Sequence, residues 1–138
     1  MSKYAEQAEN FLKVNNLQFR ATQTAANACP PWDDERHIHG DEYQITISRK
    51  GVSGRLSFRF WNSLNDVQNG NEPNAYDVLS CVSSEAYTPE TFRDFCAEYG
   101  YDEDSRKAEK TFKRADRFAH RIRAFFSEKE LEAVSEIR

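Results

Sequence analysis

One polar segment, CPPWDDERHIH at residues 29–39, gathers side chains of the types that hold metal ions. Thiols, carboxylates and imidazoles are ligands for zinc and other divalent ions, and a site needs three or four of them to converge. The spacing Cys-x₇-His-x-His matches no structural zinc pattern, and an extended His-x-His pair is common by chance. We therefore predict a solvated loop anchored by its tryptophan, with no bound metal. The ligand types are Cys29, Asp33, Asp34, His37 and His39.

Nucleophilic catalysis has little support in the sequence. Cys81 and Cys96 fall on apolar faces of predicted helices, where a reduced cysteine normally acts as a small core hydrophobe. An odd count of three cysteines with no close pair does not indicate a disulfide framework. The five glycines are too scattered to form a phosphate-binding loop. We therefore expect neither an enzyme nor a cofactor.

Basic residues recur on one predicted helix at intervals of three and four, as a single helix face requires. Residues 105–123 hold 8 basic and 2 acidic residues, whereas residues 1–104 hold 9 and 17. Such a face could contact nucleic-acid phosphates or acidic patches of a partner protein. The alternative is a solvated helix face whose basic side chains pair with the protein's own acidic side chains. This basic stripe consists of Lys110, Arg114, Arg117 and Arg121.

A second candidate surface is the outer face of a predicted β-hairpin. Arginines that alternate along a strand and end in a tryptophan have the composition of an interface hot spot, and they can also stack on bases. The alternative is that the arginines are ordinary sheet-surface residues and that the tryptophan lies under a loop. The hairpin residues are Arg49, Arg55, Arg59 and Trp61.

The polar loop supplies a third predicted contact surface. Its acids could enter the basic groove of a nucleic-acid-processing partner and compete there with phosphate. The predicted contacts are Trp32, Asp33, Asp34 and Glu35.

Hydrophobic spacing predicts the elements that position these surfaces. Helical spacing at residues 3–14 predicts a first helix. Alternation predicts three half-buried strands, and the turn KGVSG at residues 50–54 joins the last two into a hairpin. Two polar stretches, at residues 26–42 and 62–74, are predicted to be loops. The predicted strands are residues 17–23, 43–49 and 55–61.

The C-terminal half is predicted to be helical. One helix covers residues 75–82. Thr88, followed by a proline and an acid, is predicted to start a second helix, and Gly100 is predicted to end it. Asp102 or Asp104 is predicted to cap a long third helix.

The long helix is predicted to end near Phe126, where Ser127 and Glu130 form a capping box for a last helix. Together these elements predict one α+β domain over residues 1–138, in which C-terminal helices cover one face of a three-stranded antiparallel sheet. No apolar run approaches the roughly 20 residues of a membrane span, and the N-terminus lacks the apolar segment of a signal peptide. We therefore expect a cytoplasmic protein without a membrane partner.

Several stretches, in the order found here, resemble a family of small uncharacterised proteins carried by bacteriophages and prophages. The resemblance covers roughly residues 30–138, and its most specific part is YDVL followed by FRDFCAEYGYDEDSRKA. It implies no particular reaction and no catalytic residue. Small phage-borne proteins often bind and block a host machine, as anti-CRISPR and other anti-defence inhibitors do. The stretches are PPW, HGDEYQITISR, FRFWNS, PNAYDVLSCV, YTPETFRDFCAEYGYDEDSRKAEKTF and FFSEKELEAVSEI.

The resemblance therefore implies an accessory protein of a phage or mobile element that inhibits a host defence complex of the CRISPR type by stoichiometric binding. Its partner would be a host protein or ribonucleoprotein. The alternative is a small nucleic-acid-binding protein that uses the basic helix at residues 105–123. A third hypothesis is a metal-dependent enzyme that uses Cys29, His37 and His39.

Overall fold

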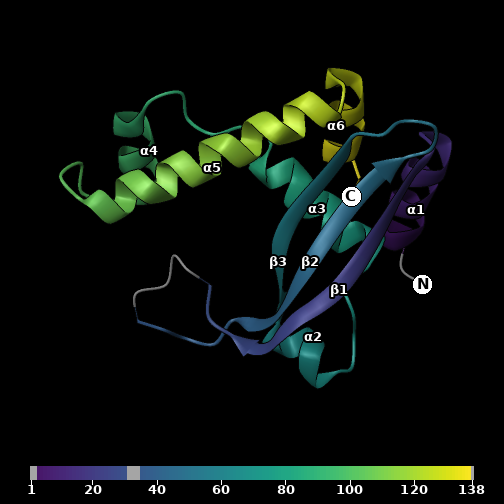
Figure 1. The fold of residues 1–138 in the computed structure, drawn as a ribbon, viewed down its shortest axis with the longest axis horizontal. Helices are drawn as coiled ribbons and strands as arrows, with labels where there is room; N and C mark the ends of the chain where they lie inside the picture. The colour runs from purple at the N-terminus through teal and green to yellow at the C-terminus, as the bar shows by residue number, and fades with distance from the viewer. Residues whose placement is uncertain (1–2, 31–34, 138) are drawn as a thin grey trace.

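A three-stranded antiparallel sheet lies against a layer of helices in the computed structural model, which describes residues 3–30 and 35–137 (Figure 1). Along the chain the elements are α1 (Lys3–Val14), β1 (Leu17–Ala28), β2 (Gly40–Arg49), β3 (Arg55–Ser63), α2 (Leu64–Gln68), α3 (Ala75–Glu85), α4 (Phe92–Tyr99), α5 (Arg106–Phe125) and α6 (Glu128–Ser135). The strands lie in the order β1-β2-β3, so β1 and β3 are the sheet edges. The predicted α+β fold with its central hairpin is confirmed.

Alternation along the hairpin decides which of its faces is buried, because successive side chains of a strand point to opposite sides. Tyr43, Ile45 and Ile47 of β2 are buried, and the residues between them are only partly covered. The apolar residues of β3 lie directly opposite those of β2, so one face of the hairpin is continuously apolar. The inward-facing pairs are Tyr43–Phe60, Ile45–Phe58 and Ile47–Leu56.

Helices cover this apolar face as predicted, but the N-terminal helix also belongs to the layer. α1 packs against α3 and β1, α3 packs against α5 and α6, and α5 packs against β3. Val78, Val82 and Ile122 are completely buried in this layer. The hydrophobic core therefore joins both ends of the chain.

The second C-terminal helix begins three residues later than predicted. The hydroxyl of Thr88 donates a hydrogen bond to the carbonyl of Ala115 on α5 at 3.2 Å, so it forms a contact between elements and does not cap α4. Thr91 caps α4 instead, because its hydroxyl accepts a hydrogen bond from the backbone N–H of Asp94 at 3.1 Å. Gly100 ends α4 with a left-handed conformation at φ 73°, as predicted.

The cap of the long helix was predicted at the wrong residue as well. The hydroxyl of Ser105 accepts from the backbone N–H of Ala108 at 3.2 Å and caps α5. The carboxylate of Asp102 accepts from the backbone N–H of Asp104 and shapes the turn before the helix. The capping box predicted at Ser127 is present at the start of α6.

The two predicted loops are shorter than their polar composition indicates. β1 extends to Ala28 and β2 begins at Gly40, so the first loop loses residues at both ends. Helix α2 lies inside the second, where the hydroxyl of Ser63 accepts from the backbone N–H of Asp66 at 3.1 Å. Among the described helices, none combines the length and hydrophobicity that a bilayer span requires.

Candidate functional site

Arg49 does not lie on the outer face of the hairpin, where the sequence analysis placed it. It is two residues beyond Ile47 on β2 and therefore shares the inward face. There its guanidinium donates to both carboxylate oxygens of Glu130 on α6, at 2.8 and 3.0 Å. The prediction was wrong because it applied strand alternation to the apolar residues and not to Arg49. This side chain joins β2 to α6 within the fold.

Arg55 and Arg59 are exposed on the outer face, as predicted. Arg59 forms an ion pair with Glu42 of β2, and its guanidinium lies 5.2 Å from the ring centroid of half-buried Trp61. The hydrogen bond from Arg59, and then one from Thr24, hold the pKa of Glu42 below its usual value. Arg59 and Trp61 therefore have fixed positions at the end of the hairpin.

All four residues of the basic stripe are exposed on α5. Within residues 3–30 and 35–137, none of them forms an ion pair with a carboxylate. Arg121 instead places its guanidinium 5.4 Å from the ring centroid of Phe118. In the described part of the chain, the stripe therefore keeps its charge available for another molecule.

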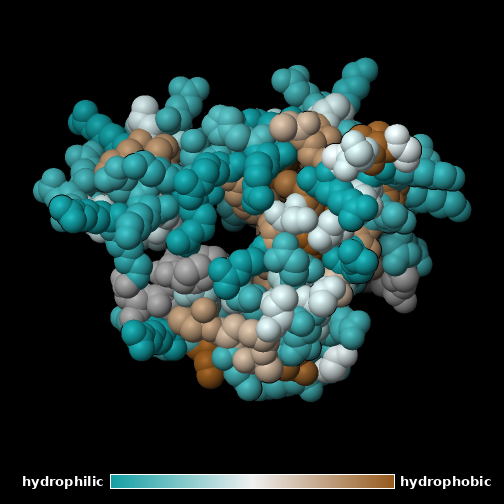
Figure 2. Space-filling view, in the orientation of Figure 1, coloured by the Kyte–Doolittle hydropathy of each residue, from teal (hydrophilic) through white to brown (hydrophobic). Residues whose placement is uncertain are grey.

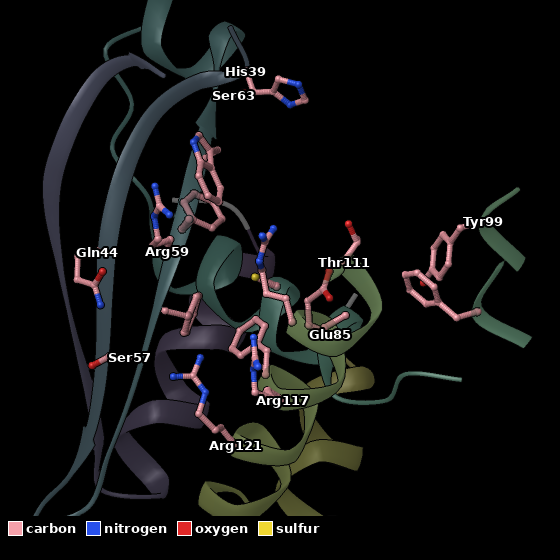
Figure 3. Close-up of a pocket in the computed structure, with 18 of the residues that line it drawn as sticks. His39, Gln44, Ser57, Arg59, Ser63, Glu85, Tyr99, Thr111, Arg117 and Arg121 are labelled. Atoms are coloured by element: carbon pink, nitrogen blue, oxygen red, sulfur yellow. The ribbon is translucent and has the colours of Figure 1, made fainter. Parts of the chain in front are cut away.

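Arg59 and three residues of the basic stripe, Arg114, Arg117 and Arg121, meet across one cleft of about 1200 Å³, which we call the β3–α5 cleft. At one end of this cleft the rings of Phe58 and Phe118 contact each other, with centroids 5.1 Å apart. From this contact α5 and β3 run in different directions (Figure 1). Arg59 lines the strand side, and Arg117 and Arg121 line the helix side (Figure 3). Two surfaces that the sequence predicts separately thus form one site.

Figure 2 shows the cleft as a hollow below α5, with hydrophilic side chains along its α5 side. Arg114 also lines the helix side, whereas Lys110, one turn nearer the start of α5, is not among the lining residues. Glu85 is the one carboxylate among the described lining residues. The described lining residues therefore give the cleft a net positive charge, which favours an anionic ligand.

Aromatic rings form the wall of the cleft farthest from the sheet. Phe95 of α4 is buried and packs against Tyr99 and Tyr101, with ring centroids 4.8 and 5.7 Å apart. The two tyrosines are 57% and 42% exposed, so their rings are accessible to a ligand. Such rings can stack on bases or on the side chains of a bound peptide.

Cys81 and Glu85, both on α3, complete the lining of the cleft. Burial, with a smaller contribution from the Glu85 charge, raises the pKa of the Cys81 thiol to about 12. Desolvation likewise raises the pKa of Glu85 above its usual value. A thiol that stays protonated near neutral pH is a poor nucleophile.

The acidic loop can be followed only in part. Trp32, Asp33 and Asp34 lie outside the described residues. Glu35 is exposed, and its carboxylate lies 3.6 Å from the imidazole of His37. The predicted contacts of this loop therefore stay predictions.

The three proposed metal ligands are placed differently from one another. The thiol of Cys29 donates to the carbonyl of Pro30 at 3.4 Å. His37 is exposed beside the acidic loop, and His39 lines the β3–α5 cleft. No group of three metal-ligating side chains gathers anywhere in residues 3–30 or 35–137.

Several lining residues of the cleft were not predicted. They come from β2, β3, α3, α4, α5 and the segment that follows α4, and they meet only because α4 and α5 fold back toward the hairpin, which no local sequence pattern encodes. The high content of aromatic residues was the one feature of the sequence that could have pointed to these lining residues. The additional residues are Gln44, Ser57, Phe60, Glu85, Tyr99, Tyr101, Thr111 and Phe118.

A cleft lined by arginines and accessible rings can bind an anionic, extended segment of another macromolecule. It offers Arg59, held in place by Glu42, and the cations of Arg114, Arg117 and Arg121, which form no ion pair within residues 3–30 and 35–137. No protein-family model, curated protein or solved structure matches this chain.

Proposed function

We propose that the protein acts by stoichiometric binding, and that the β3–α5 cleft holds a segment of the bound macromolecule. The observation that carries the proposal is the convergence of Arg59 on β3 with Arg114 and Arg117 on α5 around a single cleft. Arginine and aromatic residues dominate the hot spots of protein interfaces. The proposal includes no catalytic step, which agrees with the raised pKa of the Cys81 thiol.

We propose a host defence complex of the CRISPR type as the partner. The resemblance to phage and prophage proteins supports this choice. The charge of the cleft supports it as well, because a positive cleft suits an acidic segment of such a complex. In this role the protein inhibits the complex by occupying a surface that the complex needs.

Capture of the defence complex from lysate of a phage-infected host tests the proposal, with mass spectrometry to identify the captured proteins. The double variant Arg114→Glu with Arg117→Glu reverses two charges in the cleft and should lower capture and inhibition by about tenfold or more. Lys129→Glu reverses an exposed charge on α6, away from the basic stripe and the cleft, so it should retain both. Equal capture and inhibition by the double variant and the unchanged protein would remove the cleft from the mechanism.

The acidic loop has a test of its own in the same assay. Charge reversal at Asp33, Asp34 and Glu35 should weaken capture if these residues contact the partner. Unchanged capture and inhibition would exclude the loop.

Direct binding of single-stranded nucleic acid is the second candidate. Arg114, Arg117 and Arg121 form no ion pair within the described residues, and the accessible rings of Tyr99 and Tyr101 line the same cleft. Cations combined with stacking rings are typical of single-strand binding. Fluorescence anisotropy with an oligothymidine at two salt concentrations separates the candidates, because phosphate contacts predict an affinity that falls steeply with salt.

A further inference from the structure

We propose that the segment bound in the β3–α5 cleft is an extended acidic peptide of the partner, which pairs with β3 as a fourth strand of the sheet. This inference rests on the proposed function and specifies the kind of ligand that the cleft takes. Three observations carry it: the edge position of β3, the regularity of that edge, and the charges that face it.

β3 is an edge strand, and in the described part of the chain only β2 pairs with it. Side chains from both faces of β3 line the cleft: Ser57 and Arg59 from the outer face, and Phe58 and Phe60 from the inner face. A cleft that reaches both faces of a strand must run along the strand's edge. The backbone N–H and C=O groups on that edge can therefore pair with a peptide that enters the cleft.

The two edges of the sheet differ in regularity. β3 pairs with β2 without interruption from Arg55 to Ser63. β1 pairs with β2 through two register shifts, between Gln23 and Ala25 and between Ala25 and Ala28. Bulges twist an edge and disfavour the addition of another strand. β3 is therefore the edge suited to receive a strand.

The charges around this edge favour an acidic peptide. Arg59 lies on the strand itself, where Glu42 of β2 already pairs with it, so the unbalanced charge comes mainly from Arg114, Arg117 and Arg121 on α5. Glu85 is the one carboxylate among the described lining residues. A second copy of β3 would bring its own arginines against these cations, which disfavours self-association along this edge. Nucleic acid can neutralise the cations, but its backbone has no amide groups to complete a β-ladder. An acidic peptide can do both.

Selection from a display library of random dodecapeptides tests this inference on the full-length protein. We expect the selected peptides to be enriched in Asp and Glu together with β-branched residues, which favour extended conformations. With a selected peptide bound, amide hydrogen exchange should slow at alternate residues between Ser57 and Ser63, because the N–H groups on the free edge become hydrogen-bonded. The double variant at Arg114 and Arg117 should weaken peptide binding by about tenfold, whereas Lys129→Glu, at an exposed position of α6 outside the cleft, should not.

Three results would overturn strand pairing. They are a library that yields no acidic peptides, a bound acidic peptide that leaves the β3 amides unprotected, and binding of an oligothymidine dodecamer in preference to every selected peptide. If any of these occurs while the double variant still abolishes capture of the defence complex, strand pairing fails and the proposed function stands. Protection of the β3 amides without capture of a defence complex would support strand pairing and reject the proposed partner.

Discussion

Arg49 and Glu130 form a two-point ion pair that ties strand β2 to helix α6. The guanidinium Nη1 lies 2.8 Å from Oε2 and Nη2 lies 3.0 Å from Oε1. Nη1 also donates to the carbonyl of Asn15 at 3.2 Å, so the end of α1 is held at the same point. Glu130 accepts the backbone N–H of Ser127 at 2.9 Å as part of the α6 capping box. One arginine thus organises three elements.

Replacement of this arginine should destabilise the fold. Arg49→Met removes the charged hydrogen bonds and leaves the half-buried Glu130 carboxylate without its cation, so we expect a loss of about 2 kcal/mol in the free energy of unfolding. Arg55→Met is the matched control, because Arg55 is exposed and forms no ion pair within the described residues; its effect should stay within about 0.5 kcal/mol. Urea unfolding measures both. Equal losses would show that the Arg49 pair contributes little to stability.

The same pair predicts a dependence of stability on pH. Partial burial opposes ionisation of Glu130, but the hydrogen bonds from Arg49 and Ser127 outweigh it and hold the pKa below its usual value. A lowered pKa in the folded state adds stability above the pKa of the unfolded state, and this stability disappears as the pH falls through the folded pKa. The difference in unfolding free energy between the unchanged protein and Glu130→Gln should therefore be largest near neutral pH and shrink below about pH 5. A difference that does not change with pH would contradict this assignment.

Local patterns predicted the elements of this fold well and their ends less well. The alternation in β2 and the spacing in α5 depend on periodicity, which neighbouring residues carry in the sequence. Helix caps are harder to predict from the sequence, because a hydroxyl such as that of Thr88 can donate to a distant carbonyl instead of capping the helix that follows it. Helix α2 was missed because it has only five residues and buries none of them.

The candidate site could be predicted only as separate parts. The arginines of β3 and the basic stripe of α5 are each visible as patterns of charge. Their convergence depends on the packing of α5 against β3, which includes the contact of Phe58 with Phe118, two residues far apart in the sequence. Tyr99 is the last residue of α4 and Tyr101 follows the left-handed turn at Gly100, and no local sequence pattern predicts that both rings line one cleft.

Gly40 is required where the chain enters β2. Its φ is +144°, and a Cβ built there would lie 1.6 Å from the carbonyl oxygen of Asn62 on β3. Gly40→Ala should therefore cost about 2 kcal/mol or more of unfolding free energy, since both the backbone conformation and the neighbouring strand resist it. Gly54→Ala is the control: its Cβ would meet nothing within 4 Å, so stability should change by about 0.5 kcal/mol or less. Thermal unfolding compares them, and equal melting temperatures would contradict the close approach.

Cys81 should react slowly with alkylating agents although it lines the cleft. Its pKa of about 12, against an ordinary value of 9.0, lowers the thiolate fraction about a thousandfold at pH 8. Mass spectrometry after treatment with iodoacetamide should find Cys81 largely unmodified in the folded protein and rapidly modified in guanidinium chloride. Equal rates of alkylation in the folded and unfolded protein would show that the thiol is accessible and ionised. Cys81 would then be a candidate nucleophile in the cleft.

Glu85 should weaken the attraction of the cleft for anions in a manner that depends on pH. Its raised pKa means that it takes up a proton at a higher pH than an ordinary carboxyl, and the cleft becomes more positive when it does. A heparin fragment is a suitable probe, because its sulfates stay ionised while Glu85 titrates. Glu85→Gln should bind the fragment a few-fold more tightly near neutral pH, by about 1 kcal/mol, and the difference should vanish as the pH falls and Glu85 becomes neutral in the unchanged protein.

Glu132→Gln changes an exposed residue of α6 that does not line the cleft, and this variant should bind like the unchanged protein at each pH. If Glu85→Gln binds the fragment no better than Glu132→Gln does near neutral pH, the charge of Glu85 does not act on ligands in the β3–α5 cleft.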